Sequence, residues 1–222
     1  MNREEIIQTL KAPAEFWAQK SREEVRALLG EETAAMAGFD QRNPYHAYPL
    51  FLHCVYTAEE IDGKADSLLR TAAFFHDVGK PAVAFEKEGR LVFYGHAKES
   101  AVIAEQVLEK MGFSRDEIRE VCFYIEHHDD FMSWMLPTEP YDHKNTFMVP
   151  ITREKLERHI RKTAKKTELD LRRHHWENLL ELCRADVLTQ ADIVWMPEGK
   201  VKSTKGRKLR RVEAIRRLLE EQ

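Results

Sequence analysis

The sequence has few cysteines and no long apolar run. Its three cysteines are widely separated, and each lies in an apolar stretch with helical spacing. Free buried thiols in a reducing compartment are therefore favoured over a disulfide framework. The N-terminus has no apolar signal core, and no uncharged apolar stretch approaches the roughly 18 residues of a membrane span. These absences predict a cytoplasmic protein without a membrane segment.

An excess of charge of either sign is also missing. Lysine and arginine total 35 residues and aspartate and glutamate total 38, which leaves a net charge of −3 at pH 7. This balance gives no sign that the whole surface attracts nucleic acid or membrane, although charge can still be distributed unevenly. With 43% apolar and 33% charged residues, the composition suits a globular protein with charged helix faces, and 222 residues are enough for one substantial core.

Apolar residues recur at helical spacing through most of the chain. Residues 82–95 carry the one strand signal, two short extended pieces around a Glu88-Gly89 turn. The pattern predicts an all-α fold, a helical bundle with a small β-hairpin near 83–94. The predicted helices cover residues 3–11, 21–38, 50–61, 65–77, 97–111, 114–129, 152–167, 168–190 and 207–221.

Ten histidines are many for a chain of this length, and several lie where a helix faces inward. His53 and Asp186 each continue the apolar stripe of their helix, and His76-Asp77 closes an apolar helix. Buried imidazole and carboxylate groups cost free energy unless something coordinates or hydrogen-bonds them, and a metal ion would meet that cost. The candidate ligands come from five segments: His53, His76, Asp77, His96, His127 or His128, and Asp186.

The mixture of ligand types indicates which metal the cluster suits. Imidazole together with carboxylate suits a divalent transition metal (Mn, Fe, Ni, Co or Zn), whereas an all-oxygen shell would suit Mg or Ca. The candidates outnumber the ligands of one tetrahedral site. Two metals bridged by a carboxylate such as Asp77 could clamp a phosphate between them. The sequence leaves open whether one or two ions bind.

Five short stretches around these candidates form a recognisable order: Asn43-Pro44-Tyr45-His46, Phe74-Phe75-His76-Asp77-Val78-Gly79-Lys80-Pro81, Gly89-Arg90-Leu91-Val92-Phe93-Tyr94-Gly95-His96, Phe113-Ser114-Arg115-Asp116-Glu117-Ile118 and Arg184-Ala185-Asp186. Their order resembles the HD-domain metal-dependent phosphohydrolase superfamily, which is named after its His-Asp doublet. The sequence is closer still to the HD domain that follows the catalytic head in some bacterial tRNA nucleotidyltransferases, the CCA-adding enzymes. The resemblance covers about residues 43–195.

This resemblance implies two groups of ligands that share one carboxylate. The group for the primary metal is His53, His76, Asp77 and Asp186. The group for a second metal is His96 with His128, and His127 is the alternative to His128.

Asp77 and Lys80 are the residues expected to take part in catalysis. Asp77 is the expected bridge between the metals. Lys80 lies just beyond the ligand pair, where its ammonium could contact a substrate phosphate as a point charge. The alternative for Lys80 is a solvated lysine at a helix end. The proton donor to the leaving group is open among Asp77, His96 and His127.

The sequence also departs from the patterns of these relatives. The 42 residues before the resemblance are too few for a nucleotidyltransferase head, so we expect a freestanding HD domain. No Gly-Tyr-Pro motif follows His127-His128, which argues against a cyclic-di-GMP phosphodiesterase of the type that carries it. The expected organisation is one structural unit with N-terminal helices (1–42) packed on an HD domain (43–195) and a basic C-terminal helical extension (196–222).

Two functions from different classes fit this pattern. The first is a metal-dependent phosphohydrolase, a phosphomonoesterase or phosphodiesterase, that acts on a small phosphorylated substrate such as a nucleotide or 2′,3′-cyclic phosphate. The second is a non-catalytic metal-containing HD module, related to tRNA processing, that binds RNA or a partner protein. The full ligand set favours the enzyme, and the basic C-terminal segment favours the module. For that segment alone, an amphipathic helix with Val212, Ile215, Leu218 and Leu219 inward is the better interpretation.

Overall fold

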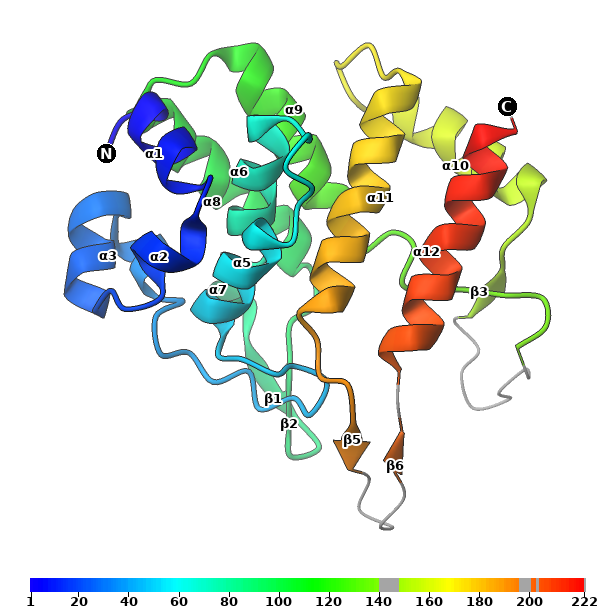
Figure 1. Cartoon of the computed structure of the whole chain (residues 1–222), viewed down its shortest axis with the longest axis horizontal. Coiled ribbons are helices and arrows are strands. Elements are labelled where there is room, and N and C mark those ends of the chain that lie inside the picture. Colours follow the sequence, from blue (N-terminus) through cyan, green and yellow to red (C-terminus); the bar gives the residue numbers. More distant parts are fainter. Residues whose placement is uncertain (140–147, 196–200, 203, 222) are drawn as a thin grey trace.

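The computed structural model describes residues 1–139, 148–195, 201–202 and 204–221, so part of the predicted extension at 196–222 lies outside the described residues. Helices dominate, which confirms the predicted all-α class (Figure 1). In chain order they are α1 (Arg3–Thr9), α2 (Pro13–Trp17), α3 (Arg22–Leu29), α4 (Glu31–Ala34), α5 (Leu50–Glu59), α6 (Ser67–Phe75), α7 (Lys80–Val83), α8 (His96–Met111), α9 (Arg115–His127), α10 (Arg153–Ala164), α11 (Arg173–Leu188) and α12 (Lys205–Glu220).

The predicted β-hairpin is present. Strand β1 (Phe85–Lys87) pairs antiparallel with β2 (Arg90–Val92), with Phe85 opposite Val92. The connecting residues Glu88 and Gly89 both have positive φ, 52° and 74°, which matches the right-handed twist of the two strands. The hairpin leads directly into α8 and so places His96 beside the centre of the bundle.

Two further strand pairs were not predicted. Strand β3 (Trp134–Met135) pairs parallel with β4 (Val149–Pro150), and β5 (Val194–Trp195) pairs antiparallel with β6 (Val201–Lys202). Each strand is two residues long, which is too short to show the apolar alternation that marks a strand in a sequence.

Glycine and proline positions explain where the helices differ from the prediction. The single helix predicted at 21–38 is wrong, because Gly30, at φ 93°, ends α3 and precedes α4. The short helices α2 and α7 were missed because Pro13 and Pro81 were interpreted only as breaks. A proline fits the first turn of a helix, where its missing N–H would have no partner anyway.

The helices share one cluster of buried apolar side chains that extends from Ile6 on α1 to Leu219 on α12. At its N-terminal end, the Trp17 ring packs at 6.1 Å from Phe51 of α5 and 5.1 Å from Phe74 of α6. Helix α6 packs against α5, α9 and α11, and α12 lies against the outer side of α11 (Figure 1). On α12, Ile215 and Leu219 are buried, as the amphipathic interpretation predicted.

The cysteines agree with the expectation from the sequence. All three cysteines are free; Cys54 and Cys183 are buried and Cys122 is half-buried. Among the described residues, no helix combines the length and apolar character that crossing a membrane requires.

The packing of α7 on α8 depends on a glycine, which gives a first prediction. Gly79 donates its backbone N–H to Ser100 Oγ at 2.9 Å, and a Cβ at residue 79 would lie 2.5 Å from Ser100 N. We expect Gly79→Ala to lower the free energy of unfolding by about 1–3 kcal/mol, because backbone atoms must move apart. Urea denaturation measures this change.

Gly63→Ala is the matched control, since the nearest heavy atom to its added Cβ would be Arg70 Nη2 at 3.9 Å. We expect its unfolding free energy to stay within about 0.5 kcal/mol of the wild type. Equal effects of the two substitutions would contradict the close approach of α7 to α8.

Candidate metal centre

The structure brings six of the candidate side chains to one place in the bundle. They come from the middle of α5, the C-terminal end of α6, the start of α8, the end of α9 and the last turns of α11. All except His96 are buried, and His96 is half-buried. The six residues are His53, His76, Asp77, His96, His128 and Asp186.

A first group forms around His53 and His76. Their Nε2 atoms and a carboxylate oxygen of Asp77 lie within 4.8 Å of one another. His76 Nε2 is 3.3 Å from Asp77 Oδ2, and His53 Nε2 is 3.0 Å from Asp186 Oδ1. Two imidazoles and two carboxylates from three helical segments thus converge on one point.

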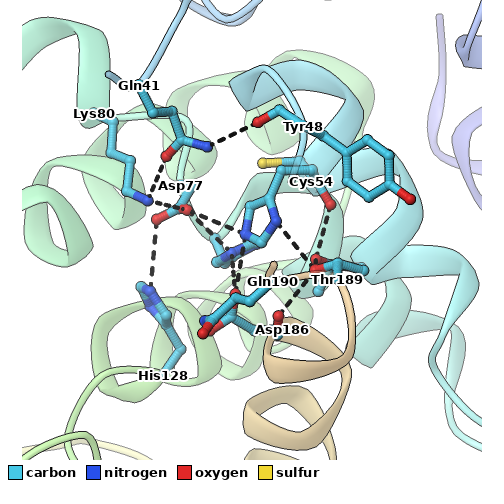
Figure 2. A network of polar contacts seen from close by, with 12 residues as sticks. Gln41, Tyr48, Cys54, Asp77, Lys80, His128, Asp186, Thr189 and Gln190 are labelled. Carbon is cyan, nitrogen blue, oxygen red and sulfur yellow. Dashed lines mark hydrogen bonds and ion pairs between the residues drawn. The ribbon is translucent and has the colours of Figure 1, made fainter. Parts of the chain in front are cut away.

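A second group shares Asp77 with the first. Asp77 Oδ1 lies 3.1 Å from His96 Nε2 and 3.7 Å from His128 Nε2. Figure 2 shows Asp77 between Lys80 and His128. The two oxygens of this carboxylate therefore face different histidine pairs, which is the arrangement that a bridging ligand requires.

The other ring nitrogen of each histidine is held by a hydrogen bond. In His76, His96 and His128, Nδ1 lies 2.7, 3.0 and 2.7 Å from the backbone carbonyl oxygen three residues earlier. Because a carbonyl only accepts, Nδ1 carries a proton, and in the neutral ring Nε2 is left with a lone pair that faces the cluster. His53 Nδ1 bonds Thr189 Oγ1 at 3.0 Å, and this hydroxyl donates to a backbone carbonyl. Such outer bonds orient histidines that ligate metals.

Three of the inward-facing atoms are buried without a hydrogen bond, which tests whether a metal fits. His53 Nε2, His76 Nε2 and Asp77 Oδ1 have no hydrogen-bond partner among the described residues. A buried polar atom left in this state costs about 1–3 kcal/mol. Nitrogen and carboxylate donors aimed at a common point suit a divalent transition metal. The residues present therefore fit the metal expected from the sequence.

The charge of Asp77 is balanced mainly by Lys80. Burial opposes ionisation of Asp77, but the Lys80 ammonium and the nearby imidazoles outweigh it and hold the Asp77 pKa well below its usual range. Lys80 Nζ lies 2.6 Å from Asp77 Oδ2 and donates to Gln41 Oε1 at 2.9 Å (Figure 2). Lys80 is only 5% exposed, so its interpretation as a solvated lysine is wrong.

Asp129 belongs to the cluster although it was not a candidate. Its carboxylate oxygens lie 3.2 Å from His96 Nε2 and 3.7 Å from His128 Nε2. Burial lowers the pKa of His96, but the neighbouring carboxylates of Asp129 and Asp77 outweigh it and raise this pKa to about 10, so without a metal the ring holds a second proton, which a bound cation would displace. The only sequence signal for Asp129 was its place directly after the histidine pair.

His127 does not face the cluster. Its Nδ1 bonds Asp130 Oδ2 at 2.7 Å, and its ring packs at 5.0 Å from Phe123. Asp130 also lies 3.2 Å from His159 Nε2, and His127, Asp130 and His159 line a different cavity from the candidate centre. Between the two adjacent histidines, the geometry favours His128 as a ligand.

A separate group of possible ligands lies on α9 and α11, but one of its histidines presents no lone pair to an ion. Glu120, His174 and His175 lie close enough to hold an ion. His175 Nδ1, however, accepts the backbone N–H of Arg172 at 3.0 Å. The neutral ring then carries its proton on Nε2, which removes the lone pair that a metal needs.

The candidate centre forms the floor of a cavity of about 460 Å³. Asp77, His96, His128 and Asp186 are among its lining residues, and aromatic side chains and Lys208 stand around them. His46 also lines it, with its ring 5.0 Å from that of His53. Burial lowers the pKa of His46 to about 3, so this ring is neutral near pH 7. The volume is in the range of small-molecule sites.

Comparison with known proteins agrees with this geometry. The HD domain family matches residues 45–167, which is more than half of the chain. The chain therefore belongs to the HD-domain family. The match ends before Asp186, which α11 brings back to the cluster.

One relative connects the chain with tRNA nucleotidyltransferases. It is a CC-adding tRNA nucleotidyltransferase from Thermus thermophilus, 33% identical over 135 residues. The matched region covers 58% of this chain and 31% of that relative. The resemblance found in the sequence motifs is thus confirmed for a part of the relative's length.

The hydrogen bond from His53 to Thr189 gives a second prediction. Thr189→Val keeps the side-chain volume but removes the acceptor that fixes the His53 ring. We expect the affinity for Mn²⁺ to fall about tenfold to a hundredfold, as for other outer-shell partners of metal-ligating histidines. Isothermal titration calorimetry of the metal-free protein with Mn²⁺ measures this change.

Thr33→Val is the control, because Thr33 is buried and its hydroxyl bonds only the backbone oxygen of Leu29 in the N-terminal region. Its Mn²⁺ affinity should equal that of the wild type. If both variants bind Mn²⁺ alike, the ring orientation of His53 does not depend on Thr189.

Proposed function

We propose that this HD-domain protein is a metal-dependent phosphohydrolase that acts on a nucleotide or a 2′,3′-cyclic phosphate. The observation that carries the proposal is the set of buried, unbonded atoms on His53, His76 and Asp77, within the described residues, that face one another. Burying such atoms without a partner costs free energy, which a bound metal would offset.

We assign the first metal to the group His53, His76, Asp77 and Asp186. We assign the second to His96, His128 and Asp77, with Asp129 as an additional oxygen donor. Mn, Fe, Ni, Co and Zn all suit these donors. His127 is left out, since its ring is bonded to Asp130.

The residues around the centre have distinct tasks in this proposal. A bound metal supplies Lewis acidity and the activation of water at neutral pH. Lys80 keeps Asp77 ionised and lines the cavity, where its ammonium offsets negative charge on the phosphoryl oxygens. Gln41 fixes Lys80, because its Oε1 accepts from Nζ while its Nε2 donates to the Tyr48 carbonyl oxygen at 3.4 Å (Figure 2).

The wall of the cavity supports a nucleotide as the substrate. Tyr45, Phe93 and Tyr94 line it, and Tyr94 is 66% exposed. Aromatic faces next to a phosphate site offer a stacking surface to a nucleobase, worth about 1–3 kcal/mol per base. A phosphate at the floor and a base at the aromatic wall would occupy the cavity together.

A non-catalytic role in RNA or partner binding is the second candidate. It is supported by the relative, whose printed name describes an enzyme that acts on tRNA, and by the basic residues of α12. An RNA-binding module has no need of unbonded, buried metal donors, so we place the phosphohydrolase first. We also propose a cytoplasmic location, since three free cysteines suit a reducing compartment.

Replacing the shared carboxylate tests the enzymatic proposal. Asp77→Ala removes an oxygen donor from both proposed metal sites. We expect hydrolysis of bis-p-nitrophenyl phosphate, 2′,3′-cyclic AMP or 5′-nucleotides with Mn²⁺, Ni²⁺ or Co²⁺ to fall about a hundredfold or more. Release of p-nitrophenol or of phosphate measures the rate, and circular dichroism checks the fold.

Asp116→Ala is the matched control, because this carboxylate is 90% exposed at the start of α9. It should keep the wild-type rate. An absence of metal-dependent turnover in the wild type, or equal rates in both variants, would support the binding module instead.

The adjacent histidines at the end of α9 allow a test of the second metal. We expect His128→Ala to lower the metal content from two ions per chain to one, because it removes a donor beside Asp77. His127→Ala should keep two ions, since its ring faces Asp130. Elemental analysis of protein prepared with excess Mn²⁺ gives the content. The same loss in both variants would contradict the assignment of His128.

A further inference from the structure

Lys208, on the basic C-terminal helix α12, points into the cavity of the candidate metal centre. It lines the cavity together with Lys80, Asp129 and Asp186, although it lies well beyond the residues that match the HD family. Its ammonium lies 5.9 Å from the centroid of the Tyr45 ring. The sequence had shown this lysine only as one of many basic residues in the C-terminal segment.

A side-chain amide links Lys208 to the proposed first metal site. Lys208 Nζ donates to Gln190 Oε1, and Gln190 Nε2 donates to Asp186 Oδ2 at 3.1 Å. Gln190 and Asp186 lie side by side in Figure 2. The side chain of Gln190 therefore connects the Lys208 ammonium to Asp186, a proposed metal ligand.

Three other cationic groups near this face have carboxylate partners. Lys80 pairs with Asp77, Lys205 lies 2.8 Å from Asp192, and Arg211 pairs with Glu139.

Lys208 differs, because no carboxylate among the described residues lies within 4.0 Å of its Nζ and its hydrogen-bond partner Gln190 is neutral. A half-buried ammonium without an anion has lost hydration that nothing in the protein replaces. Burial lowers its pKa, even though the charges of Asp186 and Asp129 act in the opposite direction. An anion that enters the cavity would be its natural partner.

We propose that Lys208 binds the substrate phosphate and selects phosphomonoesters over phosphodiesters. This inference rests on the proposed function, whose substrate class it narrows. A phosphomonoester carries about −1.5 to −2 charges near pH 7, whereas a diester carries one. Lys80 shares its charge with Asp77, whereas Lys208 has no carboxylate partner among the described residues, so Lys208 can meet the second charge of a phosphomonoester. A charge-assisted hydrogen bond to a dianion is stronger than one to a monoanion.

The test compares two ligands that share base and sugar and differ in phosphate charge, 5′-AMP and 3′,5′-cyclic AMP. Isothermal titration calorimetry measures their binding to the Mn²⁺-loaded full chain. In the wild type we expect AMP to bind more tightly than cyclic AMP. Lys208→Met should weaken AMP binding about tenfold or more and cyclic AMP binding by about threefold at most. Lys208→Arg, which keeps the charge, should stay within about threefold of the wild type for both ligands.

Arg217→Met is the matched control, because it removes one positive charge from the same helix at a position that is 72% exposed. It should bind both ligands as the wild type does. Melting curves and metal content of every variant show whether the fold and the centre persist, and Lys208→Arg tests the residue without removing its charge.

Three results would overturn the inference. The first is that the wild type binds AMP no more tightly than cyclic AMP. The second is that Lys208→Met lowers the affinity for both ligands equally. The third is that Lys208→Met and Arg217→Met have the same affinity for AMP. The proposed function fails by a different result, the absence of metal-dependent hydrolysis. A protein that prefers AMP through Lys208 but hydrolyses nothing would keep this inference and remove the enzymatic proposal.

Discussion

The buried, ionised carboxylate of Asp77 is the group on which the rest of the structure depends. Burial alone would keep it protonated, and the ammonium of Lys80 with the surrounding imidazoles reverses that preference. An uncompensated charge at this depth would cost on the order of several kcal/mol. The compensating groups come from α5, α6, α7, α8 and α9, so these helices must pack together before the charge is balanced.

The ring orientations in the cluster follow from the helices themselves. Three of the four histidines bond a carbonyl of their own chain segment, three residues earlier, so each ring is fixed by its own backbone. His53 is different, because Thr189 of a distant segment holds it. The two proposed metal sites therefore depend on the fold in different ways: one needs α11 in place, and the other is oriented by local backbone.

Sequence periodicity predicted correctly that the candidate ligands on regular helices face inward. His53 and Asp186 continue apolar stripes inside regular helices, where spacing alone determines the direction of a side chain. Helical spacing determines less at helix ends, where His127 and His128 close α9 and Asp129 lies beyond it.

Residues that join the site through long-range packing have no recognisable pattern in the sequence. Gln41, Gln190 and Lys208 join the site only through tertiary contacts, and a charge count could not separate Lys208 from its basic neighbours. The short helices α2 and α7 were missed because a proline can either end a helix or occupy its first turn.

The wide spacing of the cluster along the chain has a consequence for protein synthesis. His53 and its partner Thr189 are 136 residues apart, and Asp186 is also made late. While the ribosome is still translating α10, the nascent chain already contains the four histidines of the cluster but lacks the Asp186 carboxylate and the Thr189 hydroxyl. Packing of α11 therefore completes the group around His53, and any ion held there would stabilise the finished chain over its unfinished precursors.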